Sequence, residues 1–168
     1  GIMAYVAYEF TGADFNSEQS ARFNAAIGRE YYSSDCAVTP SAAEFYVCNS
    51  RTLAGYIPIG KHRSVGISTI TRRSWKEIRS SSTDIYLIWL PLRGSVTITQ
   101  GSHSAIVEPG NMALCYSNEP LCVKTSPDDA QEHLSMQIIA PAHLVAKALT
   151  EPKRLCGISF PADRGAAL

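Results

Sequence analysis

The sequence contains no run of apolar residues long enough to cross a bilayer, and no basic-then-apolar signal peptide opens it. It also lacks an excess of charge of either sign, because 15 Lys and Arg residues balance 15 Asp and Glu residues. A chain without net charge is poorly suited to binding a polyphosphate backbone by itself. These absences argue against a membrane partner and against a self-sufficient nucleic-acid-binding domain.

Cysteine and histidine lack the spacings that are typical of metal sites. The five cysteines, an odd number, form no C-x-x-C pair, and no two of the four histidines are spaced as H-x-H or H-x-x-x-H. The sequence therefore predicts no metal site and no cofactor. Since there is also no export signal, we expect reduced thiols and a cytoplasmic location. Cys48, Cys115 and Cys122 lie in apolar runs and are predicted to be buried.

The composition is that of one globular domain with a sizeable core, since 45% of the 168 residues are apolar and 18% are charged. Near the start of the chain, Phe23 and Ile27 recur at helical spacing after a candidate N-cap at Asn16 or Ser17. This pattern predicts a helix over residues 17–32.

Beyond Pro40, the sequence takes on the alternation and turn spacing of strands. Turns recur about every ten residues, which is typical of a β-sandwich or β-barrel. The predicted strands span residues 45–48, 52–59, 65–72, 75–79, 85–92, 95–100, 105–107, 112–116, 121–125 and 131–139. Pro141 then opens a second predicted helix over residues 142–149. The predicted fold is mostly β, with one helix before the strands and one after them.

An ordered series of short motifs carries a family resemblance. The series runs through segment 84–94, Gln100-Gly101, the turn at 107–112 and segment 116–120. In this order the motifs resemble the N-terminal domain of AraC/XylS-type transcription regulators. Asn111 stands where that family usually has Asp, and it keeps the same side-chain turn chemistry.

The resemblance implies a cupin-like β-barrel or sandwich that senses a small molecule. In that family, helices that mediate dimerisation and a DNA-binding domain of two helix-turn-helix units follow the sensor. On this basis, residues 1–16 are a tag scar and flexible N-terminus, and residues 17–140 are the N-terminal helix plus the cupin-like sensor barrel. Residues 141–168 begin the helical dimerisation and linker segment, and the DNA-binding domain is expected to be absent from this chain.

The implied function is ligand sensing and dimerisation within a bacterial regulator. The full-length protein is expected to be a homodimer that binds DNA through its C-terminal domain and responds to a small-molecule effector. The stub at 163–168 suggests the start of a helix, so we expect this chain to dimerise weakly or not at all.

The candidate ligand-binding residues lie on predicted strands or at their ends; they are Arg72, Arg73, Tyr86, Trp89, Met112, Tyr116 and Met136. Trp89 and Tyr86 lie on opposite faces of one strand, so only one of these rings can point inward. Arg72 and Arg73 also lie on opposite faces of a strand, and they offer a fork for a carboxylate. Core packing is the alternative for the aromatic and Met side chains, and a solvated strand end is the alternative for the arginines. We expect an aromatic or carboxylate-bearing effector.

Two other functions stay open. Metal-binding cupins use histidines on the strand before the hairpin and after the following turn, and segments 96–100 and 111–114 contain none. A metal-free cupin enzyme, such as a sugar epimerase or isomerase, would need a facing acid and base, for instance His133 with Tyr86. A β-rich interaction module without a small ligand would instead have an interior packed solid around Trp89 and Met136. We assign no catalytic residue and expect no enzymatic activity.

Overall fold

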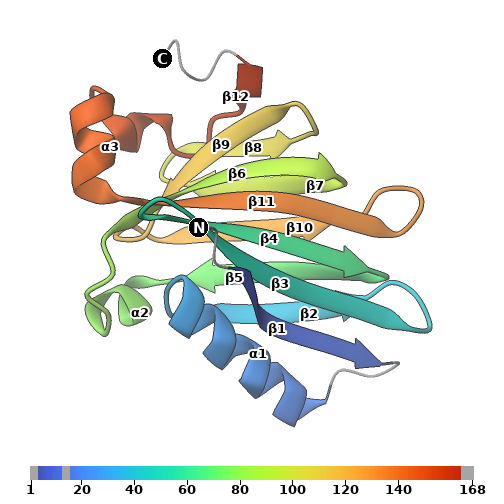
Figure 1. Cartoon of the computed structure of the whole chain (residues 1–168). Helices are drawn as coiled ribbons and strands as arrows, with labels where there is room; N and C mark the ends of the chain where they lie inside the picture. Colours follow the sequence, from blue (N-terminus) through green and yellow to red (C-terminus); the bar gives the residue numbers. More distant parts are fainter. Residues whose placement is uncertain (1–3, 13–15, 164–168) are drawn as a thin grey trace.

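The computed structural model describes residues 4–12 and 16–163, which form two antiparallel β-sheets packed face to face (Figure 1). The larger sheet consists, in spatial order, of β1 (Ala4–Gly12), β3 (Phe45–Ala54), β4 (Ile57–Val65), β11 (Glu132–Pro141), β6 (Ile85–Arg93), β9 (Asn111–Tyr116) and β12 (Phe160–Pro161). The smaller sheet consists of β2 (Asp35–Pro40), β5 (Ile67–Arg73), β10 (Leu121–Ser126), β7 (Ser95–Gln100) and β8 (His103–Val107). The prediction of a mostly β, cupin-like fold is confirmed, and the two sheets make it a sandwich.

Helix α1 (Ser17–Glu30) lies beside the sandwich and contacts both β1 and β2, the first strands of the two sheets (Figure 1). Its N-terminus is capped by Asn16, whose side chain accepts a hydrogen bond from the Gln19 N–H at 2.8 Å. Phe23 and Ile27 are buried on the face toward the sheets. The sequence prediction of this helix is confirmed, and α1 therefore covers one open side of the interior.

The structure differs from the sequence prediction before Pro40. Ala4–Gly12 forms strand β1, where a flexible terminus was expected, and its backbone pairs with β3. Asp35–Pro40 forms β2, which pairs with β5. Neither strand has a strong alternating pattern, because both are sheet edges whose outward side chains are exposed.

Three predicted strands also have to be corrected. Residues Trp75–Arg79 form the short helix α2, since Ser74 and Glu77 make a capping box that starts a helical turn. The predicted strands 45–48 and 52–59 are replaced by the longer strands β3 and β4, with the hairpin turn at Gly55-Tyr56. Gly55 has φ +66°, so the turn itself selects glycine there.

After the sheets, helix α3 (Ala142–Ala148) and the 3-10 helix η1 (Pro152–Leu155) pack against the outer face of the larger sheet. The predicted second helix is thus confirmed. None of the helices within residues 4–12 and 16–163 is long and apolar enough to span a membrane. The predicted helical stub at 163–168 lies almost entirely outside the described residues.

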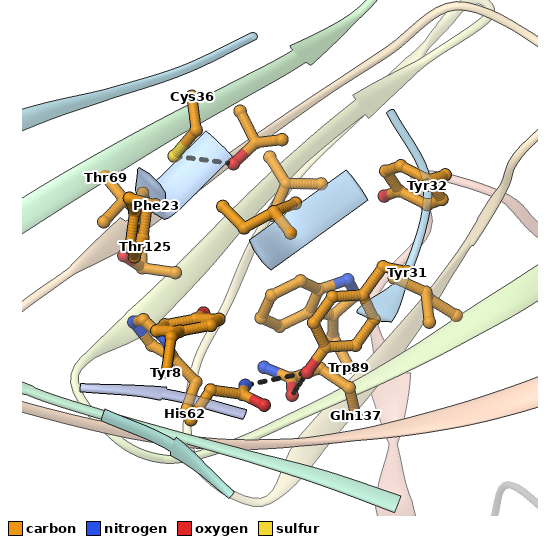
Figure 2. A pocket seen from close by; sticks show the side chains of 15 residues that line it. Tyr8, Phe23, Tyr31, Tyr32, Cys36, His62, Thr69, Trp89, Thr125 and Gln137 are labelled. Atoms are coloured by element: carbon orange, nitrogen blue, oxygen red, sulfur yellow. Dashed lines mark hydrogen bonds between the residues drawn. The ribbon is translucent and has the colours of Figure 1, made fainter. Parts of the chain in front are cut away.

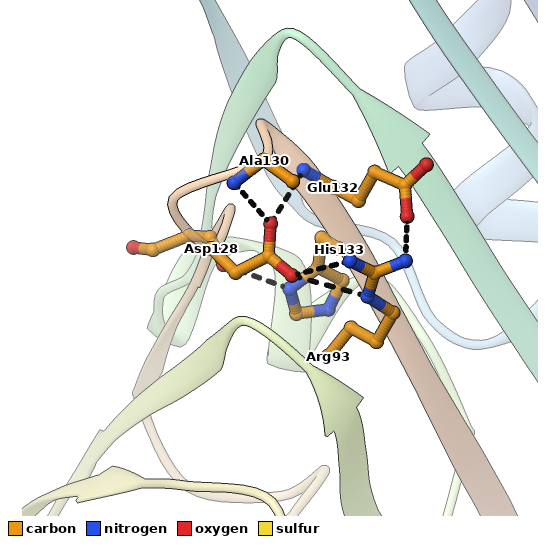
Figure 3. A network of polar contacts seen from close by, with 6 residues as sticks. Arg93, Asp128, Ala130, Glu132 and His133 are labelled. Atoms are coloured by element: carbon orange, nitrogen blue, oxygen red, sulfur yellow. Dashed lines mark hydrogen bonds and ion pairs between the residues drawn. The ribbon is translucent and has the colours of Figure 1, made fainter.

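A polar network at one rim of the sandwich shapes the turn between β10 and β11 (Figure 3). The Asp128 carboxylate accepts hydrogen bonds from the Glu132 N–H at 3.0 Å and the Ala130 N–H at 2.9 Å, and it forms an ion pair with Arg93. The hydrogen bond from the Glu132 backbone, together with these other contacts, lowers the pKa of Asp128. The network helps to fix where β11 begins, and the register of β11 decides which of its side chains face inward.

Candidate functional site

A buried cavity lies between the two sheets beneath α1 (Figure 2). Its wall includes the aromatic side chains of Tyr8, Phe23, Tyr31, Tyr32 and Trp89, which come from β1, α1 and its C-terminal end, and β6. The cavity volume is about 40 Å³. Since a water molecule needs at least about 10–15 Å³ by this measure, the cavity has room for about two or three waters.

One side of the cavity belongs to a polar wall, which we define as the inward side chains of β3, β4 and β11: Asn49, His62, Ser64, His133, Ser135 and Gln137. These side chains are neighbours because the strand register pairs Asn49 with His62 and His62 with Ser135. All of them are buried. The larger sheet therefore presents polar groups to the interior, where a sandwich normally packs apolar side chains.

The hydroxyl of Tyr31 is held at the centre of the polar wall (Figure 2). It accepts a hydrogen bond from Asn49 Nδ2 at 2.7 Å and donates one to Gln137 Oε1 at 2.9 Å. Gly60 makes this position possible, because a Cβ on Gly60 would clash with the Tyr31 hydroxyl and with Gln137 Oε1. Tyr31 thus connects the end of α1 to strands β3 and β11.

Two histidines of the polar wall lie next to each other, with ring centroids 5.6 Å apart. His62 Nδ1 is 3.4 Å from the Tyr8 hydroxyl, and His133 Nε2 is 3.0 Å from Ser135 Oγ. Burial lowers the pKa of His62 from 6.5 to about 3, and the neighbouring His133 adds to this shift. Burial also lowers the pKa of His133, against the effect of the Ser126 carbonyl. Both rings are therefore neutral at physiological pH.

Two buried arginines hold the C-terminal end of α1, and we call this pair the arginine clamp. Arg51, on the larger sheet, donates to the Glu30 carbonyl at 2.7 Å and forms an ion pair with the Glu30 carboxylate at 3.2 Å. Its guanidinium lies over the ring of Tyr31, 4.9 Å from the centroid. The first half of the clamp thus fixes the last turn of the helix and one aromatic side chain of the cavity wall.

Arg73, on the smaller sheet, forms the second half of the clamp and is only 1% exposed. It donates to the carbonyl oxygens of Ser33 and Ser117, each at 2.7 Å, and its guanidinium lies 5.1 Å from the ring centroid of Tyr32. No carboxylate of the described residues forms an ion pair with Arg73. Burial lowers the pKa of Arg73, and its charge is compensated by the carbonyl dipoles and the ring.

The side chains that line the cavity are uncharged near neutral pH. The lining contains no Asp, Glu, Lys or Arg. Burial raises the pKa of Tyr31 to about 12 and of Cys36 to about 11, and it raises the pKa values of Tyr8 and Tyr32 as well. His62 is neutral because its pKa is lowered. The cavity is therefore polar on one side but carries no net charge.

Three polar atoms at the cavity have no hydrogen-bond partner among the described residues: Asn49 Oδ1, His62 Nε2 and Trp89 Nε1. The Trp89 indole has only a weak polar interaction, with the Cys115 thiol. Buried polar atoms of native proteins are nearly always hydrogen-bonded to protein or to ordered water. The cavity is thus a place where a bound molecule would satisfy groups that the protein leaves unsatisfied.

Of the candidate residues from the sequence, Trp89 lines the cavity. Arg73 lies one layer behind the wall, on the far side of Tyr32. Arg72 is exposed on the opposite face of β5, so the two arginines do not converge on one ligand. They do not form the predicted carboxylate fork.

The remaining candidates lie on the outer face of the larger sheet. Tyr86 and Tyr116 stack with centroids 4.6 Å apart and pack in a cluster that includes Val145 of α3. Met112 lines an apolar groove of about 330 Å³ beneath α3. Met136 is half-buried on the face of β11 opposite to Gln137. None of these four side chains reaches the cavity.

The acid–base pair that a metal-free cupin enzyme would need is not assembled. His133 belongs to the polar wall inside the sandwich, whereas Tyr86 packs outside it against α3. Among the residues that the structure describes, no three His, Cys, Asp or Glu side chains are grouped to hold a metal ion.

The sequence reasoning missed most of the polar wall and the tyrosines near α1. Asn49, His62 and Gln137 are polar residues in strands, and such residues are ordinarily assigned to the solvent face. One pattern could have pointed to them: in β11, polar His133, Ser135 and Gln137 alternate strictly with apolar residues. Alternation shows that these three share a face, but it does not show that the face is buried.

Comparison with known proteins gives a family match and a fold match. A family model described as the AraC-binding-like domain matches residues 38–168. The AraC-like transcriptional activator CuxR is similar in structure, with a TM-score of 0.63 and 17% identity over 83% of this chain and 49% of that chain. The chain thus spans about half the length of the CuxR chain.

More distant matches include the EutQ protein of Clostridium difficile, with a TM-score of 0.41 and 9% identity over 58% of this chain and 70% of that chain. An HTH_3 family transcriptional regulator from Vibrio cholerae matches with a TM-score of 0.38 and 11% identity over 57% of this chain and 50% of that chain. No curated protein matches the sequence significantly.

Proposed function

The chain belongs to the AraC-binding-like domain family, and we propose that it is the ligand-sensing and dimerisation domain of a bacterial AraC/XylS-type transcription regulator. The observation that carries this proposal is the cavity between the sheets, where three buried polar atoms lack partners. A wall with a few unsatisfied polar groups among aromatic side chains is typical of a small-molecule site. The proposed domain acts in the cytoplasm, and DNA is bound by a separate part of the full-length homodimer.

The C-terminal end of α1 is the element through which we propose that a ligand acts. Tyr31 and Tyr32 line the cavity, and the arginine clamp holds the backbone on either side of them, at Glu30 and Ser33. A ligand larger than about three waters has to displace one of these rings, since the cavity has only about 40 Å³. Displacement changes the end of α1, so the ligand binds two states of the domain unequally, as regulation requires.

Strand β11 connects the cavity to the segment that would lead toward a second domain. Gln137 faces the cavity, and the next residue, Ile138, lines the apolar groove beneath α3. The strand then runs directly into α3 through Pro141. A ligand that takes over the Gln137 hydrogen bond would therefore alter the strand on which α3 packs.

The first test is the gene sequence downstream of the Leu168 codon, where we expect two helix-turn-helix units. The functional test then uses the full-length protein with a fluorescent operator fragment and a compound that raises the Tm of the domain. We expect the compound to change operator affinity by about fivefold or more. Trp89→Phe should weaken this response, whereas Lys61→Ala, at an exposed position of β4, should leave it unchanged. A missing DNA-binding segment, or an operator affinity that no bound compound alters, would overturn the proposal.

The small volume of the cavity favours one other function, a β-rich interaction module that takes no small ligand. In that case the cavity holds only water, and the apolar groove beneath α3 is the functional surface. The two functions predict opposite results for a thermal-shift screen of the isolated domain. A screen in which no compound raises the Tm, combined with loss of partner binding in Leu144→Ser, would support the interaction module.

A further inference from the structure

The unpartnered atoms at the cavity require both a donor and an acceptor from whatever binds there. Asn49 Oδ1 can only accept a hydrogen bond, and Trp89 Nε1–H can only donate one. A carboxylate offers acceptors alone, and an ammonium group offers donors alone. An amide or a hydroxyl offers both kinds of group.

The charges around the cavity point to the same conclusion. A buried carboxylate or ammonium group needs a partner of opposite charge, and the cavity lining contains none. The nearby arginines do not line the cavity. Arg51 is engaged by Glu30, and Arg73 donates to two carbonyl oxygens behind the ring of Tyr32.

The protein itself already places an uncharged hydroxyl in this position. The Tyr31 hydroxyl accepts from Asn49 and donates to Gln137, so it uses both kinds of hydrogen bond at one atom. A ligand that displaces Tyr31 has to replace these two bonds. Neutral hydroxyl and amide groups can do so, because each donates and accepts.

We propose that the cavity binds a small uncharged molecule that carries an amide or hydroxyl group, and that this group replaces the Tyr31 hydroxyl between Asn49 and Gln137. This inference rests on the proposed sensing function and narrows its ligand class. It differs from the sequence-based expectation of a carboxylate-bearing effector.

The test uses matched neutral and charged probes with the fluorescence of Trp89 as a direct readout. The chain has two tryptophans, and Trp75 is 52% exposed outside the cavity, so Trp75→Phe leaves Trp89 as the single emitter. This variant is titrated at pH 7.5 with acetamide against acetate and with benzamide against benzoate, at constant ionic strength. We expect each amide to change the emission and raise the Tm, with a Kd about tenfold or more below that of its acid.

Two variants test whether the preference for the amide arises at Asn49 in the cavity. Asn49→Ala should reduce the preference for the amide, whereas Ser50→Ala, the next residue on the opposite face of β3, should keep it. If Asn49→Ala does not fold, Trp89→Phe removes the indole N–H together with the pyrrole part of the ring, and it should weaken amide binding measured by Tm. Tighter binding of the acids would overturn the ligand class and leave the sensing function standing. If none of the probes changes either emission or Tm, the proposed ligand class fails, whereas the sensing function fails only if no compound alters operator affinity.

Discussion

The interior of this sandwich has two halves that differ in chemistry. In the apolar half, Leu87, Val96, Ile98, Val107 and Val123 of strands β6, β7, β8 and β10 pack together and are almost completely buried. In the other half, β3, β4 and β11 present the polar wall. Apolar burial stabilises the fold, whereas each buried polar atom without a partner costs about 1–3 kcal/mol. The difference teaches that one half maintains the sandwich, while the other holds the unsatisfied polar atoms on which the proposed ligand site depends.

The largest expected effect comes from the apolar half. Ile98 is fully buried, so Ile98→Ala removes buried methyl groups and leaves a cavity. We expect the free energy of unfolding to fall by about 2–5 kcal/mol in urea denaturation. Ile106→Ala, at a position of β8 that is 64% exposed, is the matched control and should change it by less than about 0.5 kcal/mol. Equal losses in both variants would contradict the assignment of this half as the stabilising core.

Gly60→Ala tests the close contact at the polar wall. The new Cβ would clash with the Tyr31 hydroxyl and Gln137 Oε1, so we expect a loss of about 1–3 kcal/mol on urea unfolding. Gly28→Ala is the control, because a Cβ at this position of α1 meets only an ordinary contact at 3.7 Å. It should stabilise the protein by about 0.5–1 kcal/mol. A neutral Gly60→Ala would show that Tyr31 does not occupy the place described.

The histidines of the polar wall predict a pH dependence of stability. The pKa values of His62 and His133 are lower in the folded state than the unfolded value of 6.5, so the unfolded chain binds more protons below that pH. The neutral histidines contribute fully to the free energy of unfolding above pH 6.5. This contribution is lost as the pH falls toward their pKa values in the folded state, which is about 3 for His62.

The free energy of unfolding should fall by up to about 1.4 kcal/mol per pH unit through His62, whose folded-state pKa is about 3, and His133 adds to the fall in the same direction. This pH dependence is measured by urea unfolding between pH 7.5 and 5.0. Most carboxyl groups stay ionised over that range, so they add little to the slope. His62→Gln should reduce the slope, whereas His143→Gln, at an exposed position of α3, should leave it unchanged. A slope that His62→Gln does not alter would mean that His62 is not buried as a neutral ring.

The smallest effect separates two serines of the polar wall. Ser64 and Ser135 are both buried, but Ser64 Oγ has no partner within the described residues, whereas Ser135 Oγ is hydrogen-bonded to His133. We expect Ser64→Ala to leave the free energy of unfolding unchanged or to raise it slightly, and Ser135→Ala to lower it by about 1 kcal/mol. The two variants are compared by urea denaturation. A larger loss in the free energy of unfolding for Ser64→Ala than for Ser135→Ala would contradict this prediction.

Much of the fold could be predicted from local patterns. Helical spacing of Phe23 and Ile27 behind an N-cap identified α1, and alternation with regular turns identified most strands after Pro40. The edge strands β1 and β2 were missed, since exposed edges need no apolar alternation. Helix α2 was mistaken for a strand, although the capping box of Ser74 and Glu77 was visible in the sequence.

The candidate site was far less predictable, and β11 shows why. Its sequence determines two faces, one with Leu134, Met136 and Ile138, and one with His133, Ser135 and Gln137. Hydrophobicity alone places the first face inside. The structure buries the polar face, because the second sheet and α1 cover that side.

The sequence by itself determined most strands after Pro40, the helix that covers the cavity and the resemblance to a family of regulators. Only the tertiary structure decided which face of each strand is inside, and that two arginines from different sheets hold the end of α1. The physical reason is that periodicity is a property of one strand, whereas burial depends on what packs against it. The tertiary structure thus decided that the cavity between the sheets is lined by uncharged side chains, which periodicity alone does not show.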